Sequence, residues 1–293
     1  MTTVEQFAWI GLGTMGAPMV RNASNKGFSI TAYNRTKKSV DVGISKTATT
    51  VEDAVTGADV VCLMVSDGAA VEDVLFGSSA AVKYMKPGSV VVNISTIGVD
   101  EAKEFALRLA NLGFEWMDAP VSGSVGPASN GTLVFLVGGA EATYRRLEPF
   151  FLSMGKTAFH LGPVGSGASM KLLVNAYLGA IVEAASECMA VADKAGLGRT
   201  KLLEVLQQTA TWAPILAAKT PMWERDDYPQ AFALKHMAKD LGLMNQFSRT
   251  ISASTPVLGS ASQVYLAALA NDLAEFDMSG VFRETARLAG TPQ

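Results

Sequence analysis

Short apolar runs alternate with amphipathic segments through the first half of the chain, and this alternation predicts strands and helices in turn. Strands are predicted at residues 7–10, 29–33, 60–65, 89–94, 115–119, 132–138 and 157–161. Helices are predicted between them, at residues 17–25, 51–54, 69–75, 100–112 and 140–152. Strands that alternate with helices in this way are typical of an α/β fold with a doubly wound parallel sheet.

The pattern changes after the glycine-rich segment 162–167, where helical stretches rich in alanine, leucine and methionine begin. No convincing strand follows, so an all-α domain is predicted. Its first helix, at 168–194, would be about 40 Å long at the α-helical rise of about 1.5 Å per residue and is apolar on nearly every side. Such a helix is surrounded by protein, so we expect it to join two domains, at 1–164 and 165–293, and to pack against a partner subunit.

Composition narrows the class of protein. The net charge of -3, without a block of lysine or arginine, argues against a nucleic-acid surface. Cys62 and Cys188 lie in apolar or strongly helical stretches and are interpreted as core residues. Two cysteines without metal-ligand spacing, and two histidines, argue against a structural metal. The first residues lack signal-peptide features and charges interrupt the long apolar stretches, so we expect no membrane span and a cytoplasmic location.

A glycine-rich turn lies directly after the first predicted strand and opens a helix. In this setting Gly11 permits the tight turn, Gly13 lets the backbone approach a pyrophosphate, and Gly16 lets helix and strand pack closely. The N-terminus of the helix faces the phosphates. The sequence therefore predicts a dinucleotide-binding site at this turn. Leu12, Thr14 and Met15 are the remaining residues of the turn and are part of the predicted site.

The residues after the second predicted strand bear on the choice of cofactor. An acidic residue there would bind the ribose 2′-hydroxyl of NAD, but the chain has Asn34, Arg35 and Thr36. An arginine at this position suits the 2′-phosphate of NADP. The alternative is that Arg35 is an ordinary solvated loop residue. The expected cofactor is NADP(H), in preference to NAD(H).

Two polar residues interrupt the long helix predicted at 168–194. Lys171 and Asn175 stand one turn apart, so they share a face. Desolvation lowers the pKa of a lysine, and such a lysine can deliver a proton to the oxygen on which charge develops when hydride reduces a carbonyl. Asn175 can orient the ammonium group or hold a substrate oxygen. Alternatively, Lys171 extends to solvent at the start of the helix.

Polar residues also follow two predicted strands. Ser122, with the backbone N–H groups of Gly123 and Ser124, can bind a carboxylate in an anion nest at the end of the strand 115–119. The same residues also suit a plain polar turn. Thr96 follows the strand 89–94 on the same edge, where its hydroxyl can reach the cofactor or the substrate.

A pair of charged residues stands in the helical half. Lys239 and Asp240 can bridge cofactor and domain, although charges on a helix are more often solvated. His236 is interpreted as a surface or packing residue and is given no role.

Read together, five segments resemble the β-hydroxyacid dehydrogenase family: 11–19, 34–36, 118–124 with 131–133, 165–175 and 239–240. The resemblance covers almost the whole chain. Within the family it is greatest to the glyoxylate and succinic semialdehyde reductase branch, through residues 120–124, 232–236 and 34–36. It implies an N-terminal Rossmann domain and a C-terminal helical domain joined by a long helix, and a homodimer or homotetramer.

The resemblance also implies roles for particular residues, with Lys171 as the catalytic acid and base and Asn175 beside it. The substrate site is expected to comprise Ser122, Gly123, Ser124, Lys171, Asn175 and Phe232, of which Ser122, Lys171 and Asn175 are catalytic. The cofactor site is expected to comprise Gly11, Leu12, Gly13, Thr14, Met15, Gly16, Asn34, Arg35, Thr36, Val65, Ser66, Thr96 and Lys239.

The expected function is the NADPH-dependent, reversible reduction of small aldehyde or keto acids to hydroxyacids. Members of the reductase branch usually have a basic pair after the serine-glycine-serine turn, whereas this chain has Val125 and Gly126, which leaves the substrate open. One alternative is an imine reductase of the same fold, a branch that usually replaces the catalytic lysine. Another is a non-catalytic NADP-binding or chromatin-associated protein, against which Lys171 and the lack of a basic tail argue.

Overall fold

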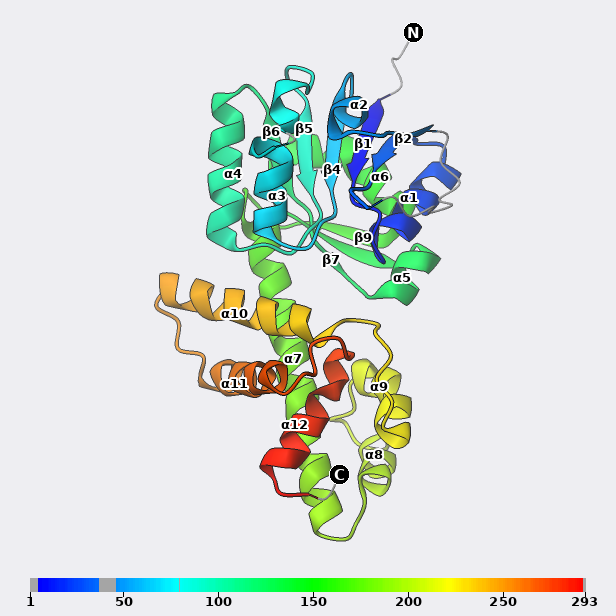
Figure 1. Ribbon diagram of the computed structural model, residues 1–293, viewed down its shortest axis with the longest axis vertical. Coiled ribbons are helices and arrows are strands. Elements are labelled where there is room, and N and C mark those ends of the chain that lie inside the picture. Colours follow the sequence, from blue (N-terminus) through cyan, green and yellow to red (C-terminus); the bar gives the residue numbers. More distant parts are fainter. Residues whose placement is uncertain (1–4, 37–45, 79, 292–293) are drawn as a thin grey trace. The chain divides into compact units, whose positions relative to one another are not determined.

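The computed structural model describes residues 5–36, 46–78 and 80–291. Contacts divide the chain into two compact units, Met1–Lys171 and Leu172–Gln293, and the division falls inside one long helix, α7 (Ser166–Lys194). Figure 1 shows strands and helices in the first unit and helices in the second. The domain boundary predicted at residue 164 lies just before α7 and stays a prediction.

A six-stranded parallel sheet forms the centre of the first unit, in the order β3-β2-β1-β4-β5-β6. Its strands are β1 (Gln6–Ile10), β2 (Ser29–Tyr33), β3 (Lys46–Thr47), β4 (Val60–Leu63), β5 (Val90–Asn93) and β6 (Glu115–Asp118). Between them run α1 (Gly16–Asn25), α2 (Val51–Val55), α3 (Gly68–Phe76), the short 3-10 helix η1 (Ala81–Lys83) and α4 (Val99–Asn111). The strand order reverses between β1 and β4, and such a switch point places a ligand crevice at the carboxyl ends of the strands. The predicted α/β fold is confirmed.

The first unit also contains a second sheet, of three strands, which the sequence did not predict to be separate from the first. It contains β7 (Val121–Ser122), β8 (Leu133–Val137) and β9 (Gly155–His160), and β7 is antiparallel to β8. The helices α5 (Val125–Asn130) and α6 (Glu141–Met154) connect these strands. The expectation of a single parallel sheet was therefore wrong for the strands after β6. A strand of two residues carries no readable periodicity, and the short connection through α5 suits antiparallel pairing.

The core of the first unit explains why its strands read as continuous apolar runs. Residues of β1, β4 and β5 are buried on both faces of the sheet, as expected where helices cover both sides. Phe7 of β1 stacks on Phe150 of α6 with ring centroids 4.2 Å apart, and Phe28 packs edge-on against Phe7 at 5.5 Å. This aromatic cluster holds α6 against the sheet.

The second unit is helical, as predicted. After α7 it contains α8 (Arg199–Leu206), α9 (Pro214–Arg225), α10 (Leu234–Thr250), α11 (Pro256–Ala270), the short helix η2 (Met278–Gly280) and α12 (Val281–Leu288). Asp277, which is fully buried, pairs with Lys219 of α9 at 2.7 Å and accepts the backbone N–H of Phe232 at 2.9 Å. This carboxylate ties the loop before α10 to α9 and η2.

Part of the surface of α7 is exposed in the single chain, and the expected contact of this helix with a partner subunit stays a prediction. Tyr177 and Val191 are 68% and 64% exposed. Cys62 is buried, as expected of a core residue, but Cys188 is exposed, so the interpretation of Cys188 as a core residue was wrong. Cys188 lies on the same exposed helix face as Glu187 and Val191. The high apolar content of the whole helix gave no sign of this exposed face.

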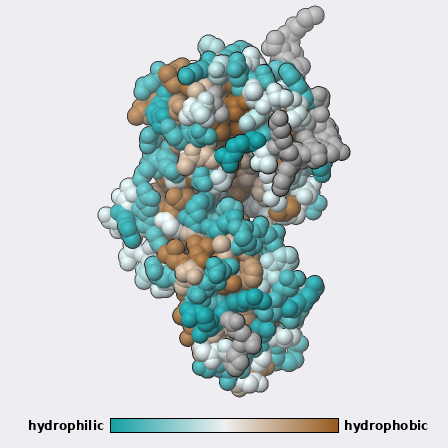
Figure 2. Space-filling model, viewed as in Figure 1, coloured by the Kyte–Doolittle hydropathy of each residue, from teal (hydrophilic) through white to brown (hydrophobic). Residues whose placement is uncertain are grey.

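By length and composition α7 could cross a membrane, and half of its most apolar 18-residue stretch is buried in the fold. The core helix of a globular protein passes the same test. Figure 2 shows further apolar surface on the helical unit. Val257 and Leu266 of α11 are also exposed.

Candidate active site

The glycine turn between β1 and α1 is held by close backbone packing. Gly11 has a φ of +105°, and a methyl group there would lie 2.1 Å from the carbonyl oxygen of Met64. A methyl group at Gly16 would lie 2.1 Å from the carbonyl oxygen of Gly11. The indole of Trp9 donates to that same oxygen at 2.9 Å. Both positions therefore require glycine for the turn itself.

Gly13 meets a different environment, which fits the approach of a ligand. It is exposed, and a methyl group there would have no protein atom within 4 Å. The first turn of α1 has no acidic residue, and Met15 at its N-cap makes no side-chain cap. Backbone N–H groups and the positive end of the helix dipole thus face the side where a pyrophosphate would bind. Residues 12–16 fit the phosphates of a dinucleotide.

Asn34 connects this turn to the end of β2. Its Oδ1 accepts the backbone N–H of Leu12 at 2.9 Å, and its Nδ2 donates to the carbonyl oxygen of Thr36 at 2.8 Å. Arg35, between them in sequence, is exposed. The structure therefore brings the two predicted cofactor segments together through one amide.

The loops after β4 and β5 are tied together by polar residues that the sequence analysis did not select. Ser95, which is buried, accepts the backbone N–H of Val65 through its Oγ at 2.9 Å. The fully buried Asn93 in turn accepts the N–H of Ser95 at 3.2 Å and donates to its carbonyl at 3.1 Å. This network fixes the loops that carry Val65, Ser66 and Thr96. In the sequence, the polar Asn93 at the end of an apolar strand was the signal that could have indicated this network.

The predicted carboxylate site lies where the chain leaves β7. Gly123 has a φ of +127°, and a methyl group there would lie 2.8 Å from Leu133 and 2.9 Å from Pro127. Ser122 ends β7 and Ser124 is the N-cap of α5, and both are half-buried while Gly123 is exposed. Two serines thus flank an exposed glycine turn, and this residue combination suits an anion.

Lys171 and Asn175 lie one turn apart on α7, as predicted. Lys171 is 8% exposed, in the second turn of the helix, so the alternative that its side chain extends into solvent is not supported. Asn175 is also buried, and its Nδ2 donates to Oδ2 of Asp240 on α10 at 2.6 Å. The Nζ of Lys239 pairs with the other carboxylate oxygen of Asp240 at 3.2 Å. Asp240 thus orients Asn175, a role the sequence analysis did not assign.

Phe232 and His236 lie beside each other at the start of α10. Their rings stack with centroids 6.4 Å apart, and both side chains are half-buried. Burial and the nearby Lys239 lower the pKa of His236. The packing role given to His236 agrees with this contact, and the role predicted for Phe232 at the substrate stays a prediction.

Two models of known protein families together match almost all of the chain. The family model for the NAD binding domain of 6-phosphogluconate dehydrogenase matches residues 6–162. The model described as NAD-binding of NADP-dependent 3-hydroxyisobutyrate dehydrogenase matches residues 165–285. The chain belongs to the β-hydroxyacid dehydrogenase family.

Individual relatives of this dehydrogenase agree with that assignment. Glyoxylate/succinic semialdehyde reductase 2, chloroplastic, of Arabidopsis thaliana is 35% identical over 93% of this chain and 77% of its own length. Glyoxylate/succinic semialdehyde reductase 1 of the same plant is 32% identical over 94% and 96%. A structure of Mycobacterium tuberculosis 3-hydroxyisobutyrate dehydrogenase with L-serine is 28% identical, with a TM-score of 0.85 over 96% of this chain and 99% of the other.

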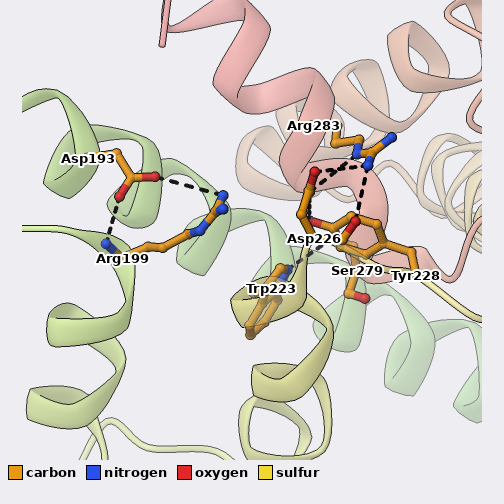
Figure 3. A network of polar contacts seen from close by, with 7 residues as sticks. All are labelled: Asp193, Arg199, Trp223, Asp226, Tyr228, Ser279 and Arg283. Carbon is orange, nitrogen blue, oxygen red and sulfur yellow. Dashed lines mark hydrogen bonds and ion pairs between the residues drawn. The ribbon is translucent and has the colours of Figure 1, made fainter. Parts of the chain in front are cut away.

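The dehydrogenase also has a pocket of about 400 Å³ in its helical unit, and none of the predicted site residues line it. Its charged residues pair with one another, as Figure 3 shows: Arg283 with Asp226 at 2.9 Å, and Arg199 with Asp193 at 3.9 Å. The guanidinium of Arg199 also lies 4.8 Å from the centre of the Phe282 ring. These pairs leave the lining without net charge, so we interpret this network as a structural tie between helices.

Metal chemistry receives no support from the side chains in residues 5–36, 46–78 and 80–291. No group of three histidine, cysteine, aspartate or glutamate residues in those ranges could hold a metal ion.

Proposed function

We propose that this dehydrogenase uses NADPH to reduce small aldehyde or keto acids of the glyoxylate and succinic semialdehyde type to hydroxyacids, and that the reaction is reversible. The observation that carries the proposal is the burial of Lys171, 8% exposed, one turn before an asparagine whose orientation is fixed. A lysine held in place beside a fixed amide is suited to donate a proton to a carbonyl oxygen as hydride reaches the carbon.

In this proposal each residue acts at a stated atom. When bound, NADPH supplies the hydride that reduces the carbonyl carbon. Lys171 supplies the proton: its Nζ–H bond breaks, an O–H bond forms on the carbonyl oxygen, and the neutral amine regains a proton from solvent. In the direction of oxidation the neutral amine takes the hydroxyl proton. The substrate carboxylate is held by Ser122, Ser124 and the N–H groups of the turn at Gly123.

Two observations support the choice of substrate and cofactor. Two relatives that match almost all of this chain are named for glyoxylate and succinic semialdehyde, which both carry a carboxylate and an aldehyde. Arg35 is the second residue after β2 and is exposed, on a segment that Asn34 holds against the glycine turn. A guanidinium at this position suits a 2′-phosphate. We therefore include a preference for NADPH over NADH in the proposal.

The test is a panel of substrates with both cofactors, followed by the absorbance of NADPH and NADH. Glyoxylate and succinic semialdehyde should be reduced faster than a cyclic imine, and NADPH should be the better donor. Faster reduction of the imine would support the imine reductase alternative. Turnover of none of the compounds would favour the non-catalytic alternative.

A substitution tests the role of Lys171 directly. Lys171→Ala should reduce kcat by about 10²- to 10⁴-fold, the usual contribution of general acid catalysis. Lys156→Ala is the matched control, because Lys156 is exposed on β9, and it should keep full activity. Near-normal turnover in a folded Lys171→Ala protein would refute the proposed role of this lysine.

We further propose a homodimer or homotetramer in which α7 contributes to the subunit contact. Met170, Leu173 and Tyr177 are exposed on one face of this helix, and a contiguous exposed apolar surface is typical of an association site. Sedimentation velocity should give a species larger than the 30.8 kDa chain. A monomer at all concentrations would exclude this assembly.

A further inference from the structure

The carboxylate of Asp118 binds the first turn of α7. Asp118 ends β6 and is fully buried. Its Oδ1 accepts the backbone N–H of Gly165 at 2.8 Å, and its Oδ2 accepts that of Ala168 at 2.8 Å. These N–H groups belong to the set that a helix start leaves without partners inside the helix. A side chain from the sheet therefore caps the helix that carries Lys171.

The backbone of Asp118 is fixed as firmly as its side chain. Its N–H donates to the carbonyl of Gly138 at 3.1 Å, and its carbonyl accepts the N–H of Gly138 at 2.8 Å. Gly138 follows β8, so this pair of bonds joins the six-stranded sheet to the three-stranded sheet. The carboxylate consequently has one position relative to both sheets.

Two glycines show how little space surrounds this junction. A methyl group at Gly138 would lie 2.9 Å from both carboxylate oxygens of Asp118. A methyl group at Gly167, in the first turn of α7, would lie 2.5 Å from the carbonyl oxygen of Asp118 and 2.3 Å from that of Leu136. Close packing on every side means that the first turn of α7 fits the sheet edge in one position.

Charge and burial act in opposite directions on this carboxylate. Burial raises the pKa of Asp118, while the backbone N–H groups of Gly165 and Ala168 oppose that rise. A negative charge at the start of a helix is favourable because it faces the positive end of the helix dipole. The carboxylate is therefore suited to holding this helix end, and it lies within a few residues of two predicted site segments.

We propose that Asp118 is a positioning residue for the reaction, which fixes α7 so that Lys171 meets the substrate oxygen held near Ser122. Lys171 lies three residues after Ala168, whose N–H is bound by Asp118, and Ser122 lies four residues after Asp118 in the chain. The side chain of Asp118 therefore fixes the start of the helix that carries Lys171. Its backbone lies at the start of the segment that carries Ser122, where the substrate is proposed to bind. The inference rests on the proposed role of Lys171.

The test is Asp118→Asn, which keeps the size of the side chain but places an NH₂ group against one of the two N–H donors. We expect kcat to fall about 10- to 100-fold, as for a small misplacement of a reacting group, while the Kd for NADPH stays within about twofold. The matched control is Asp59→Asn: Asp59 also accepts a backbone N–H, that of Gln6 at 3.0 Å, but it lies before β4 at the opposite ends of the strands. The control should keep its kcat.

A double substitution separates positioning from general damage to the fold. In the Lys171→Ala background, Asp118→Asn should cause no further loss, because the group that it positions is gone. An equal loss in both backgrounds would overturn the inference, as would a folded Asp118→Asn protein with normal kcat. If Asp118→Asn does not fold, Asp118→Ser takes its place, since its hydroxyl can accept one N–H. Failure of both to fold would also overturn it, because Asp118 would then hold the fold as a whole.

The outcomes also separate this inference from the proposed function. If Lys171→Ala alone keeps normal turnover, the proposed function of Lys171 fails. If Lys171→Ala is inactive and Asp118→Asn is fully active, the proposed function stands and only the positioning role of Asp118 fails.

Discussion

The side-chain amide of Asn175 donates to a carboxylate oxygen of Asp240 at 2.6 Å, between two residues that are 3% and 2% exposed. The second oxygen of Asp240 pairs with Lys239 at 3.2 Å. A charge-assisted hydrogen bond holds an amide in one orientation. The amide oxygen of Asn175 consequently has a defined direction before any substrate arrives.

Asp240→Asn should therefore lower kcat/KM about 10-fold, because a weakened buried hydrogen bond of this kind costs on the order of 1–3 kcal/mol. Steady-state kinetics with glyoxylate or succinic semialdehyde as the varied substrate would measure it. Asp272→Asn, at an exposed residue just after α11, is the control and should leave kcat/KM unchanged. Unchanged kinetics in the Asp240 variant would mean that the orientation of Asn175 does not matter to the reaction.

Substitution of the turn glycines should separate folding from cofactor binding. Gly13→Ala should leave the free energy of unfolding within about 0.5 kcal/mol of the original, since no protein atom lies near the added methyl group, and should weaken NADPH binding. Gly11→Ala should destabilise the protein, because its methyl group would collide with the carbonyl of Met64. Urea unfolding and a fluorescence titration with NADPH measure the two effects. Equal NADPH affinity in Gly13→Ala would show that the cofactor does not approach this residue.

Reversal of charge at Arg35 should change the cofactor preference. Arg35→Asp should reduce the ratio of kcat/KM for NADPH to that for NADH at least about 30-fold, which corresponds to about 2 kcal/mol for a lost charge pair. Lys26→Asp makes the same change of charge at another exposed position of the first unit and should leave the ratio as it was. The same ratio in both variants would place recognition of the 2′-phosphate elsewhere.

A buried glutamate in the helical unit should make stability depend on pH. Burial raises the pKa of Glu183 to about 7, despite the hydrogen bond that Thr285 donates to it, whereas the pKa of a glutamate in an unfolded chain is about 4.3. Between these values the folded protein holds a proton that the unfolded chain has released, so this group makes stability fall as pH rises, by at most about 1.4 kcal/mol per pH unit. Stability from this group is fully present below the lower value and lost above the upper one.

Glu183→Gln should remove that dependence and make the protein more stable than the original above pH 7. The difference in unfolding free energy between the two proteins, from urea titrations at several pH values, isolates this residue from other titrating groups. Glu224→Gln, at an exposed position of α9, serves as the control. A difference that does not vary with pH would show that Glu183 titrates normally.

The sequence predicted the elements whose signals are local. Gly11 and Gly16 form the turn expected of them, with methyl-group distances that exclude any other residue. Lys171 and Asn175 share a face because helical spacing alone places residues four apart together. Most strands and helices of the first unit were predicted within two residues of their bounds, since periodicity is strong in buried parallel strands and in the helices that cover them.

Features that depend on contacts distant in sequence could not be predicted in the same way. The bond between Asn175 and Asp240 joins residues 65 apart, and those from Asp118 to α7 span 47 and 50 residues. No periodicity records such pairs. The strand β7 and the helix α5 are too short to show a pattern, and the exposure of Cys188 depends on which face of α7 the rest of the unit covers.

The amide of Asn34 has a consequence for redesign of the cofactor site. It binds Leu12 through a backbone N–H and Thr36 through a backbone carbonyl, and every residue type except proline supplies both groups. The side chains at positions 35 and 36 can therefore be exchanged to recognise a different ribose while the phosphate turn keeps its support. Asn34 itself is the position that such a library must hold constant.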